Sequence, residues 1–500
     1  MNSPVEDYLA EQGRLRTPVA RFASTPAPDA GGNFTALIPL SAPTPGQQYA
    51  FEVDLDACTG CKACVAACHS LNGLDEHETW RDIGLLIGDS GGQTFAQTIT
   101  TACHHCEDPG CLNGCPVLAY EKDSVTGIVR HLDDQCIGCS YCIFTCPYDV
   151  PKYNPSRGIV RKCDLCSERL SHGEAPACVQ ACPTHAIRIT TVTVGAEAAS
   201  ADFLPGAPDP KWTRPTTRYL SSRPDVVWKE STEAALRAPE PAHWPLVLMT
   251  TLAGLGTAST ALATVETGEL SHRLWIEGAI AGVLGLAASV GHLGQPLRAW
   301  RIFLGLRRSW MSREAMLIGL WALGAGGIAI ASGPGDVPRG WQLLVSAIGA
   351  AGLFCSAMIY ATTPRPFWHF RYSGPRFLGG AVILAVGAAL AAANTSHWTL
   401  YGLMIALLAG KSAVELWPLR AGDGEEILPL KDSARLLAGP LKATLIVRLA
   451  FAAAGAVLLA GVAPPLRAAG FGLLLVGEIA ERLLFFRAVT APRMPGVVHE

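Results

Sequence analysis

The stretch CIGCSYCIFTCP, residues 136–147, is the most informative part of this sequence. Its four cysteines follow the spacing C-x2-C-x2-C-x3-C, and a proline comes directly after the last one. In bacterial ferredoxins the first three thiolates of such a run bind one 4Fe–4S cluster and the fourth binds a partner cluster. The stretch therefore predicts an iron–sulfur centre.

Three further sets of four cysteines accompany this run. An isolated C-x2-C pair is also compatible with a zinc site or a redox dithiol. Four sets, three of them followed by proline, exclude that interpretation, and no set lacks a cysteine, so no 3Fe–4S centre is expected. Sixteen thiolates at four per cluster predict four 4Fe–4S clusters, with these ligands: Cys58, Cys61, Cys64, Cys68, Cys103, Cys106, Cys111, Cys115, Cys136, Cys139, Cys142, Cys146, Cys163, Cys166, Cys178 and Cys182.

Composition divides the chain of 500 residues into two unlike parts. All but one of the 17 cysteines lie between Cys58 and Cys182, whereas the long apolar runs follow Trp244. The net charge of −3 is not that of a nucleic-acid-binding protein. The N-terminal residues show neither an apolar segment nor a twin-arginine pair, so we expect no export signal and interpret the cysteines as metal ligands rather than disulfides.

Short β-prone pieces alternate with the cysteine loops: YAFEVDL (49–55), GIVRHL (127–132) and AIRITTV (186–192). This alternation predicts an α+β ferredoxin-like domain, duplicated, over residues 48–192. Within it, 69–102 is a longer insertion that suits a partner surface. Residues 1–47 form an N-terminal extension, and the Pro-rich, charged segment 193–240 is expected to be a linker.

The C-terminal region, 241–500, contains eight apolar runs near the ~20 residues that span a bilayer. A soluble helical bundle is the alternative, but runs such as AGVLGLAASVGHLG (281–294) have no polar face. We therefore predict an all-α bundle of eight transmembrane helices, at roughly 244–265, 274–293, 315–332, 341–362, 377–394, 398–417, 443–463 and 468–487.

Basic residues in the loops predict how the bundle is oriented in a bacterial cytoplasmic membrane. Loops after the odd-numbered spans carry only Arg273, Arg339 and Arg467. By the positive-inside rule the even loops face the cytoplasm, and so does the iron–sulfur domain; an outward-facing domain is the alternative. The even loops carry Arg298, Arg301, Arg307, Arg308, Arg313, Arg365, Arg371, Arg376, Arg420, Lys431, Arg435 and Lys442.

Ionisable residues within apolar spans are costly and are candidates for function. His292, in the segment GHLGQP (291–296), and Glu314 are both expected at the membrane face shared with the iron–sulfur domain. A protonatable pair there suits quinone chemistry, in which two protons accompany two electrons. Arg448 is a further candidate, although it could instead extend to the interface, as could Arg482. Lys411 and Glu415 could be an i,i+4 ion pair. Since no two mid-span histidines face each other, no haem is expected.

Several of these stretches resemble one known family. QYAFEVDLDACTGCKACVAACH (48–69), TTACHHCEDPGCLNGCP (100–116), DDQCIGCSYCIFTCPYDVPKYN (133–154) and GIVRKCDLCSERL (158–170) resemble the four-cluster electron-transfer subunit of the dimethyl sulfoxide reductase group of molybdoenzymes. HLGQPLRAWRIF (292–303), SWMSRE (309–314) and GEIAERLLFF (477–486) resemble that group's quinol anchor. The two subunits, usually separate, look fused here.

The resemblance implies how the ligands and the roles are distributed. In the family, the first and fourth cysteine sets exchange their last ligand, as do the second and third, and the quinol-site residues fall on His292 and Glu314. It implies a separate molybdopterin catalytic subunit and electron exchange with the quinone pool in anaerobic respiration. The cytoplasmic orientation favours a sulfite dehydrogenase-type complex as an alternative. A membrane-tethered ferredoxin without quinone chemistry and a redox-driven ion pump are further alternatives.

Overall fold

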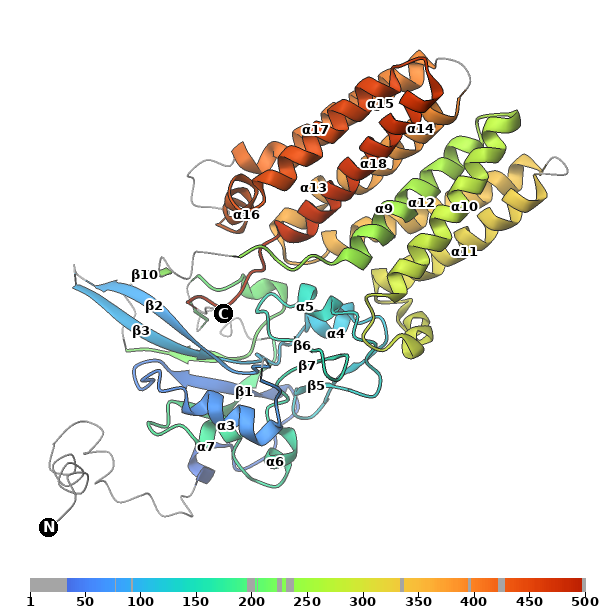
Figure 1. Ribbon diagram of the computed structural model, residues 1–500. Helices are drawn as coiled ribbons and strands as arrows, with labels where there is room; N and C mark the ends of the chain where they lie inside the picture. Colours follow the sequence, from blue (N-terminus) through green and yellow to red (C-terminus); the bar gives the residue numbers. More distant parts are fainter. Residues whose placement is uncertain are drawn as a thin grey trace, which may run out of the picture.

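The computed structural model describes residues 34–496 except 77, 91–92, 196–202, 205, 223–226, 231–237, 333–336, 394–396 and 421–427, so most of the N-terminal extension lies outside the described residues. An iron–sulfur domain and a bundle of long helices lie next to each other, and the chain passes from the first into the second (Figure 1).

A three-stranded sheet forms the base of the iron–sulfur domain. Its central strand β1 (Gln47–Asp54) pairs antiparallel with β8 (Ile187–Thr193) and parallel with β9 (Arg218–Leu220). Phe51 and Val53 of β1 are buried, which explains why this apolar stretch occupies the centre. The cysteine loops between β1 and β8 carry short helices: α3 (Ala63–Asn72), α4 (Gly110–Gly114), α5 (Tyr141–Thr145), α6 (Ser167–Ser171) and α7 (Ala177–Gln180).

Two hairpins and a ribbon complete this α+β domain. The hairpins are β4–β5 (Tyr120–Lys122 and Val129–His131) and β6–β7 (Lys152–Asn154 and Ile159–Arg161). The ribbon belongs to the predicted insertion: β2 (Asp82–Ser90) pairs with β3 (Gln93–Thr101) and with β10 (Val227–Glu230), and it extends from the domain in Figure 1.

The described part of the predicted linker 193–240 does not run free of the domain. It contributes β9 and β10, and the short helix η2 (Pro210–Trp212) precedes both strands. Phe203 is buried, where its ring contacts those of Tyr148 and Tyr219 at 5.7 and 5.8 Å. Although proline and charge are abundant here, buried apolar residues such as Phe203, Leu204 and Tyr219 hold the segment on the domain.

Seven helices in the described part of the chain are long and apolar enough to cross a membrane. They are α9 (Trp244–Ala263), α10 (Gly268–Val290), α11 (Trp310–Ala331), α12 (Arg339–Ala361), α13–α14 (Phe370–Ala392), α15 (Trp398–Leu416, extended by η6, Trp417–Arg420) and α17 (Lys442–Leu459). The eighth predicted span corresponds to α18 (Pro464–Arg487), which lies against α17 and α14 but carries more charge than the other seven. An eighth span stays a prediction.

The helices pack closely where glycines face each other. A Cβ on Gly256 of α9 would lie 2.7 Å from the carbonyl oxygen of Gly278 on α10. Such small-residue contacts let helix backbones approach each other where no hydrophobic effect drives them together. Shorter elements connect the helices at the end nearer the iron–sulfur domain: η3 (Pro296–Gly305), η4 (Pro366–Trp368), the π turn η5 (Pro375–Gly379) and α16 (Leu428–Ala438).

Several hydrogen bonds hold the iron–sulfur domain on the bundle. The Gln295 N–H donates to the Ile137 carbonyl (3.0 Å), and the Tyr141 hydroxyl donates to the Ile359 carbonyl (2.8 Å). After α18 the chain returns to the iron–sulfur domain, where Met494 is buried. The loop of the third cysteine set is therefore fixed against the ends of α10 and α12.

Candidate functional site

Two small cavities are each lined by cysteines from two different sets. One small cavity is lined by Cys103, Cys106 and Cys111 of the second set together with Cys146 of the third. Another is lined by Cys163, Cys166 and Cys178 of the fourth set with Cys68 of the first. Cys115 shares an apolar cluster with Cys111, Cys136, Cys139 and Cys142, and Cys58, Cys64 and Cys182 share another with Cys103, Cys163 and Cys178. The two cavities have the cysteine composition expected if paired sets exchange their last ligand, and Cys61 is exposed.

A repeated backbone conformation shapes these loops. The residue before the second cysteine has a positive φ in every set: 69° at Gly60, 42° at His105, 68° at Gly138 and 60° at Leu165. Left-handed residues turn successive N–H groups inward, which creates a concave site for an anion. Only the two sets in which this residue is glycine carry a signal for it in the sequence.

Backbone N–H groups donate directly to several sulfurs. The N–H groups of Ala119 and Ala186 each lie 3.3 Å from the Sγ of the cysteine four residues earlier, Cys115 and Cys182. The intervening residues Leu118 and His185 have φ values of 56° and 54°. Hydrogen bonds to cluster sulfurs are one of the means by which a protein adjusts a cluster's reduction potential.

A buried lysine lies between two of the cysteine groups. Lys162 is 2 % exposed, and its Nζ lies 3.6 Å from Cys103 Sγ. Burial alone would lower the pKa of Lys162, but the thiolates of Cys103, Cys111 and Cys163 raise it above its usual value. Groups of four thiolates, inward N–H donors and a buried cation fit anionic iron–sulfur clusters. The signal in the sequence was a lysine next to a predicted ligand.

His292 and Glu314, predicted from helix direction, line one cavity of 260 Å³ at the junction of the two domains. Cys139 of the third set forms part of the same wall, with Tyr141 beside it. The other lining residues are mostly apolar and come from α9, α10, η3, α11 and α12. No lysine or arginine occurs among the described residues that line it.

The two ionisable groups of this cavity have few partners. Neither ring nitrogen of His292 is in hydrogen-bond geometry with any described residue, although both are buried. Burial lowers the pKa of His292 to about 4, so the ring is neutral near pH 7. Glu314 is 4 % exposed and accepts a hydrogen bond from the Ser356 hydroxyl. Ser356, one turn before the end of α12, has no sequence signal that would have identified it.

Arg448 does not line this cavity but lies in a second buried cluster. Its guanidinium Nη2 lies 3.1 Å from Glu415 and 3.0 Å from Glu478. Lys411 Nζ in turn lies 3.0 Å from Glu415 and 2.7 Å from Glu478. We define the charge cluster as Arg376, Lys411, Glu415, Arg448, Glu478, Glu481 and Arg482, all buried.

This arrangement changes the interpretation of two arginines. Arg448 and Arg482 are 0 % and 3 % exposed, so neither extends towards the membrane surface. Lys411 and Glu415 do form an i,i+4 ion pair, but as one contact within a network that joins α15, α17, α18 and η5. Helix direction predicted that these charged residues lie at the end of the bundle nearer the iron–sulfur domain. The hydropathy of each helix did not show which neighbouring helix they face.

Comparison with known proteins identifies both parts of the chain. Residues 94–192 match a 4Fe-4S dicluster domain, and residues 243–417 match the DMSO reductase anchor subunit (DmsC). The B subunit of the anaerobic dimethyl sulfoxide reductase of Escherichia coli K12 is 40 % identical over 148 residues, which cover 28 % of this chain and 72 % of the relative. The chain belongs to the family of dimethyl sulfoxide reductase iron–sulfur subunits.

Other relatives support the same assignment. The B subunit of the Haemophilus influenzae anaerobic dimethyl sulfoxide reductase is 38 % identical over 150 residues, 28 % of this chain and 73 % of the relative. The formate dehydrogenase-O iron-sulfur subunit of Escherichia coli K12 is 37 % identical over 166 residues, 29 % of this chain and 54 % of that subunit. The present member of the family fuses its iron–sulfur electron-transfer domain to an anchor domain in one polypeptide.

Proposed function

We propose that this chain is the electron-transfer and anchor subunit of a membrane-bound dimethyl sulfoxide reductase-type complex. It passes electrons between the quinone pool and a separate molybdopterin catalytic subunit. The observation that carries the proposal is that Cys139, His292 and Glu314 line one cavity. A quinone ring in this cavity would therefore contact a predicted cluster ligand and two protonatable groups.

The cavity suits a quinone because its wall is largely apolar and two polar groups converge on it. Oxidation of a quinol releases two electrons and two protons. Neutral His292 accepts a proton from one hydroxyl, and the Glu314 carboxylate, positioned by Ser356, accepts one from the other. Reduction of a quinone requires the same two residues to donate protons to it. When bound, the iron–sulfur clusters supply one-electron carriers.

The two cavities lined by cysteines of paired sets support the proposal of four clusters. Three thiolates of each set would bind with the last thiolate of the paired set: first with fourth, and second with third. The cluster held by Cys115, Cys136, Cys139 and Cys142 would be the one next to the quinone. Arg448 has no place in this site, because the charge cluster engages it.

Eight spans and a cytoplasmic iron–sulfur domain are proposed from α18 and from the basic loops. Protons would then be exchanged with the cytoplasm, so quinone chemistry alone would add little to the proton gradient. In proteoliposomes with uniform orientation, turnover should not acidify the side opposite the iron–sulfur domain. Acidification there would contradict this topology or reveal a pump.

The experiment that tests the assignment is purification of the tagged chain in mild detergent, followed by assay for molybdenum or tungsten. We expect metal together with a large co-purifying subunit, whose identity distinguishes a dimethyl sulfoxide reductase from a sulfite dehydrogenase-type complex. Iron alone, without a stable partner, would instead favour a tethered ferredoxin.

A His292→Ala variant tests the quinone site in that purified complex. Quinol oxidation should fall by about 10²-fold or more, while electron transfer from a soluble dye to the catalytic subunit is retained. The matched control is His272→Ala, because His272 lies in α10 near the opposite end, next to Ser332 (2.9 Å). Equal activity of both variants would remove the quinone site from the proposal.

A further inference from the structure

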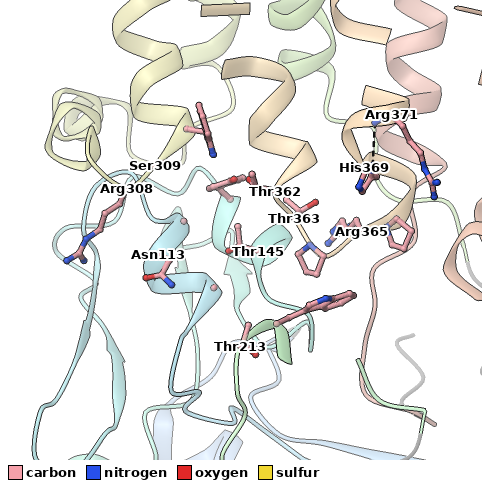
Figure 2. A pocket seen from close by; sticks show the side chains of 17 residues that line it. Asn113, Thr145, Thr213, Arg308, Ser309, Thr362, Thr363, Arg365, His369 and Arg371 are labelled. Carbon is pink, nitrogen blue, oxygen red and sulfur yellow. Dashed lines mark hydrogen bonds between the residues drawn. The ribbon is translucent and has the colours of Figure 1, made fainter. Parts of the chain in front are cut away.

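A cavity of 540 Å³ lies between the iron–sulfur domain and the ends of the membrane helices. Figure 2 shows Asn113, Thr145 and Thr213 of the iron–sulfur domain on one side and Ser309, Thr362 and Thr363 of the bundle on the other. It is separate from the quinone cavity, and among the described lining residues the two share only Tyr141. The quinone proposal assigns it no role.

The cavity is positively charged. Arg308, Arg365 and Arg371 line it together with His369, and no Asp or Glu occurs among the described lining residues. Arg308 and Arg371 are exposed at its two sides (Figure 2). A concave surface of one charge sign concentrates counter-ions, so this cavity favours an anion.

Arg365 supplies donors that the protein itself leaves unused. The residue is 3 % exposed, and its Nε and Nη1 make no hydrogen bond to any described residue. Its ion pair with Glu240 spans 3.9 Å, and its guanidinium lies 5.0 Å from the Phe144 ring centre. Burial lowers the pKa of Arg365, an effect that Glu240 opposes without cancelling. Buried charge of this kind is costly unless an anion pairs with it.

A helix start adds a second set of donors. Ser309 is the N-cap residue of α11, yet its hydroxyl makes no capping bond and, although buried, has no partner among the described residues. The first N–H groups of a helix carry partial positive charge and lack acceptors within the helix. Ser309 lines the cavity, so these donors lie at its wall.

An apolar surface leads away from the cavity along the outside of the bundle. The ring centre of Trp310, which lines the cavity, lies 6.2 Å from that of Phe354, which lies 6.0 Å from that of Phe370. Phe354 and Phe370 are 41 % and 38 % exposed on helices that we place in the membrane. The site thus combines an anion pocket with a hydrocarbon-facing row, which together fit an anionic lipid.

We propose that this cavity binds the phosphate group of an anionic phospholipid such as phosphatidylglycerol, with its acyl chains along Trp310, Phe354 and Phe370. The headgroup would neutralise Arg365 and fill the space between the two domains. The inference goes beyond the proposed function and does not depend on the quinone site. Inorganic phosphate shares the chemistry of the headgroup, and the test below distinguishes it, and an acidic segment of the catalytic subunit, from the lipid.

The test uses the full chain, with its co-purifying partner, in phosphatidylcholine nanodiscs containing increasing fractions of phosphatidylglycerol. Native mass spectrometry should show one tightly retained phosphatidylglycerol, and Arg308→Gln and Arg371→Gln should each weaken its binding about tenfold. Arg307→Gln is the matched control, because Arg307 is exposed and adjacent to Arg308 but does not line the cavity. Arg365→Gln should abolish retention if it folds; the two exposed variants test the site if it does not.

Three outcomes would overturn the proposal. Equal loss in the Arg307→Gln control would mean general surface attraction. Saturation of the site by inorganic phosphate, with no lipid retained, would mean an anion site without acyl contacts. Cross-linking of the catalytic subunit to this cavity in a lipid-free complex would mean a protein interface. Quinol oxidation by the His292→Ala variant reports on the other site alone, so failure of one proposal is distinguishable from failure of the other.

Discussion

The two halves of the helical bundle bury ionisable side chains in opposite ways. In α9–α12, with the adjoining His292 loop, His292 and Glu314 border a cavity, and among the described residues Glu314 makes no ion pair. In α13–α18, each member of the charge cluster lies within 3.5 Å of an opposite charge.

The difference suggests that the first half takes part in proton exchange and that the second half stabilises the bundle. Groups that exchange protons with a ligand must remain available, and a cavity without fixed counter-ions provides that. Buried charges that satisfy each other gain little net stability, yet removal of one leaves its partners uncompensated. Mutations in the first half should therefore change activity, and mutations in the second half should change stability.

The largest expected effect is at the sulfur that joins the cavity to a cluster. Cys139→Ser should remove the cluster next to the quinone and abolish quinol oxidation, because a serine oxygen is a poor replacement for a thiolate ligand. Iron content should fall by about a quarter, since one of the four proposed clusters is lost. Iron assay and electron paramagnetic resonance check this.

The matched control is Cys355→Ser, because Cys355 lies in α12 outside the four sets. It should retain all the iron. Full iron content in Cys139→Ser would show that this cysteine is not a ligand and would break the link between cavity and cluster.

Glu314→Gln should reduce quinol oxidation by about 10²–10⁴-fold, because the amide accepts no proton at the site. Unfolding temperature should change little, since Gln can still accept a hydrogen bond from Ser356. Stopped-flow quinol oxidation and thermal unfolding of the same preparation measure both quantities.

Glu277→Gln serves as its control. Glu277 is a second carboxyl in the first half, 3.3 Å from the Ser259 hydroxyl and outside the cavity lining. If both variants lose activity equally, carboxyls anywhere in this half matter and the cavity has no special role.

Glu415→Gln should instead lower stability. It leaves Lys411 and Arg448 with one counter-ion fewer in a buried site, which costs about 3–5 kcal/mol. Thermal or denaturant unfolding in detergent measures this loss, and quinol oxidation by the folded fraction should be unchanged.

Glu269→Gln is the corresponding surface control, since the Glu269–Arg273 ion pair is exposed and such pairs contribute about 0–1 kcal/mol. A Glu415→Gln protein with normal stability but no quinol oxidation would place the charge cluster in the reaction and would remove the contrast between the two halves.

Much of this arrangement was readable from the sequence, for definite reasons. Cysteine spacing within each set is local, so a 4Fe–4S domain was predictable from the sequence, whereas the pairing of distant sets came from the family resemblance. His292 and Glu314 came together because both lie at helix ends on one side, and helix direction follows from the order of spans. Arg448 was wrongly grouped with them, because helix direction predicts how deep a residue lies in the membrane but not which neighbouring helix it contacts.

What was missed depends on pairing between distant residues. Strand β9 has three residues and pairs with β1 across more than 160 positions, so no local pattern predicts it. Ser356 and Tyr141 likewise matter only through residues far along the chain, Glu314 and Ile359. The predicted linker is the clearest case, because its few apolar residues acquire meaning only against the folded domain.

The smallest predicted effect concerns the Tyr141 hydroxyl at the junction of the two domains. Tyr141 is 2 % exposed, and its hydroxyl holds the loop of the third cysteine set to the end of α12. Tyr141→Phe should lower the free energy of unfolding by about 1 kcal/mol, the net value of one hydrogen bond, and leave quinol oxidation within about twofold.

Tyr401→Phe is the control in the other half, where the Tyr401 hydroxyl donates to the Ala456 carbonyl at 3.2 Å and the residue is half-buried. Amide hydrogen exchange should show faster opening at α5 only in the first variant. If Tyr141→Phe lost activity as strongly as Glu314→Gln, the hydroxyl would belong to the proton-exchanging group, and the reactive region would extend from the cavity to the cluster loop.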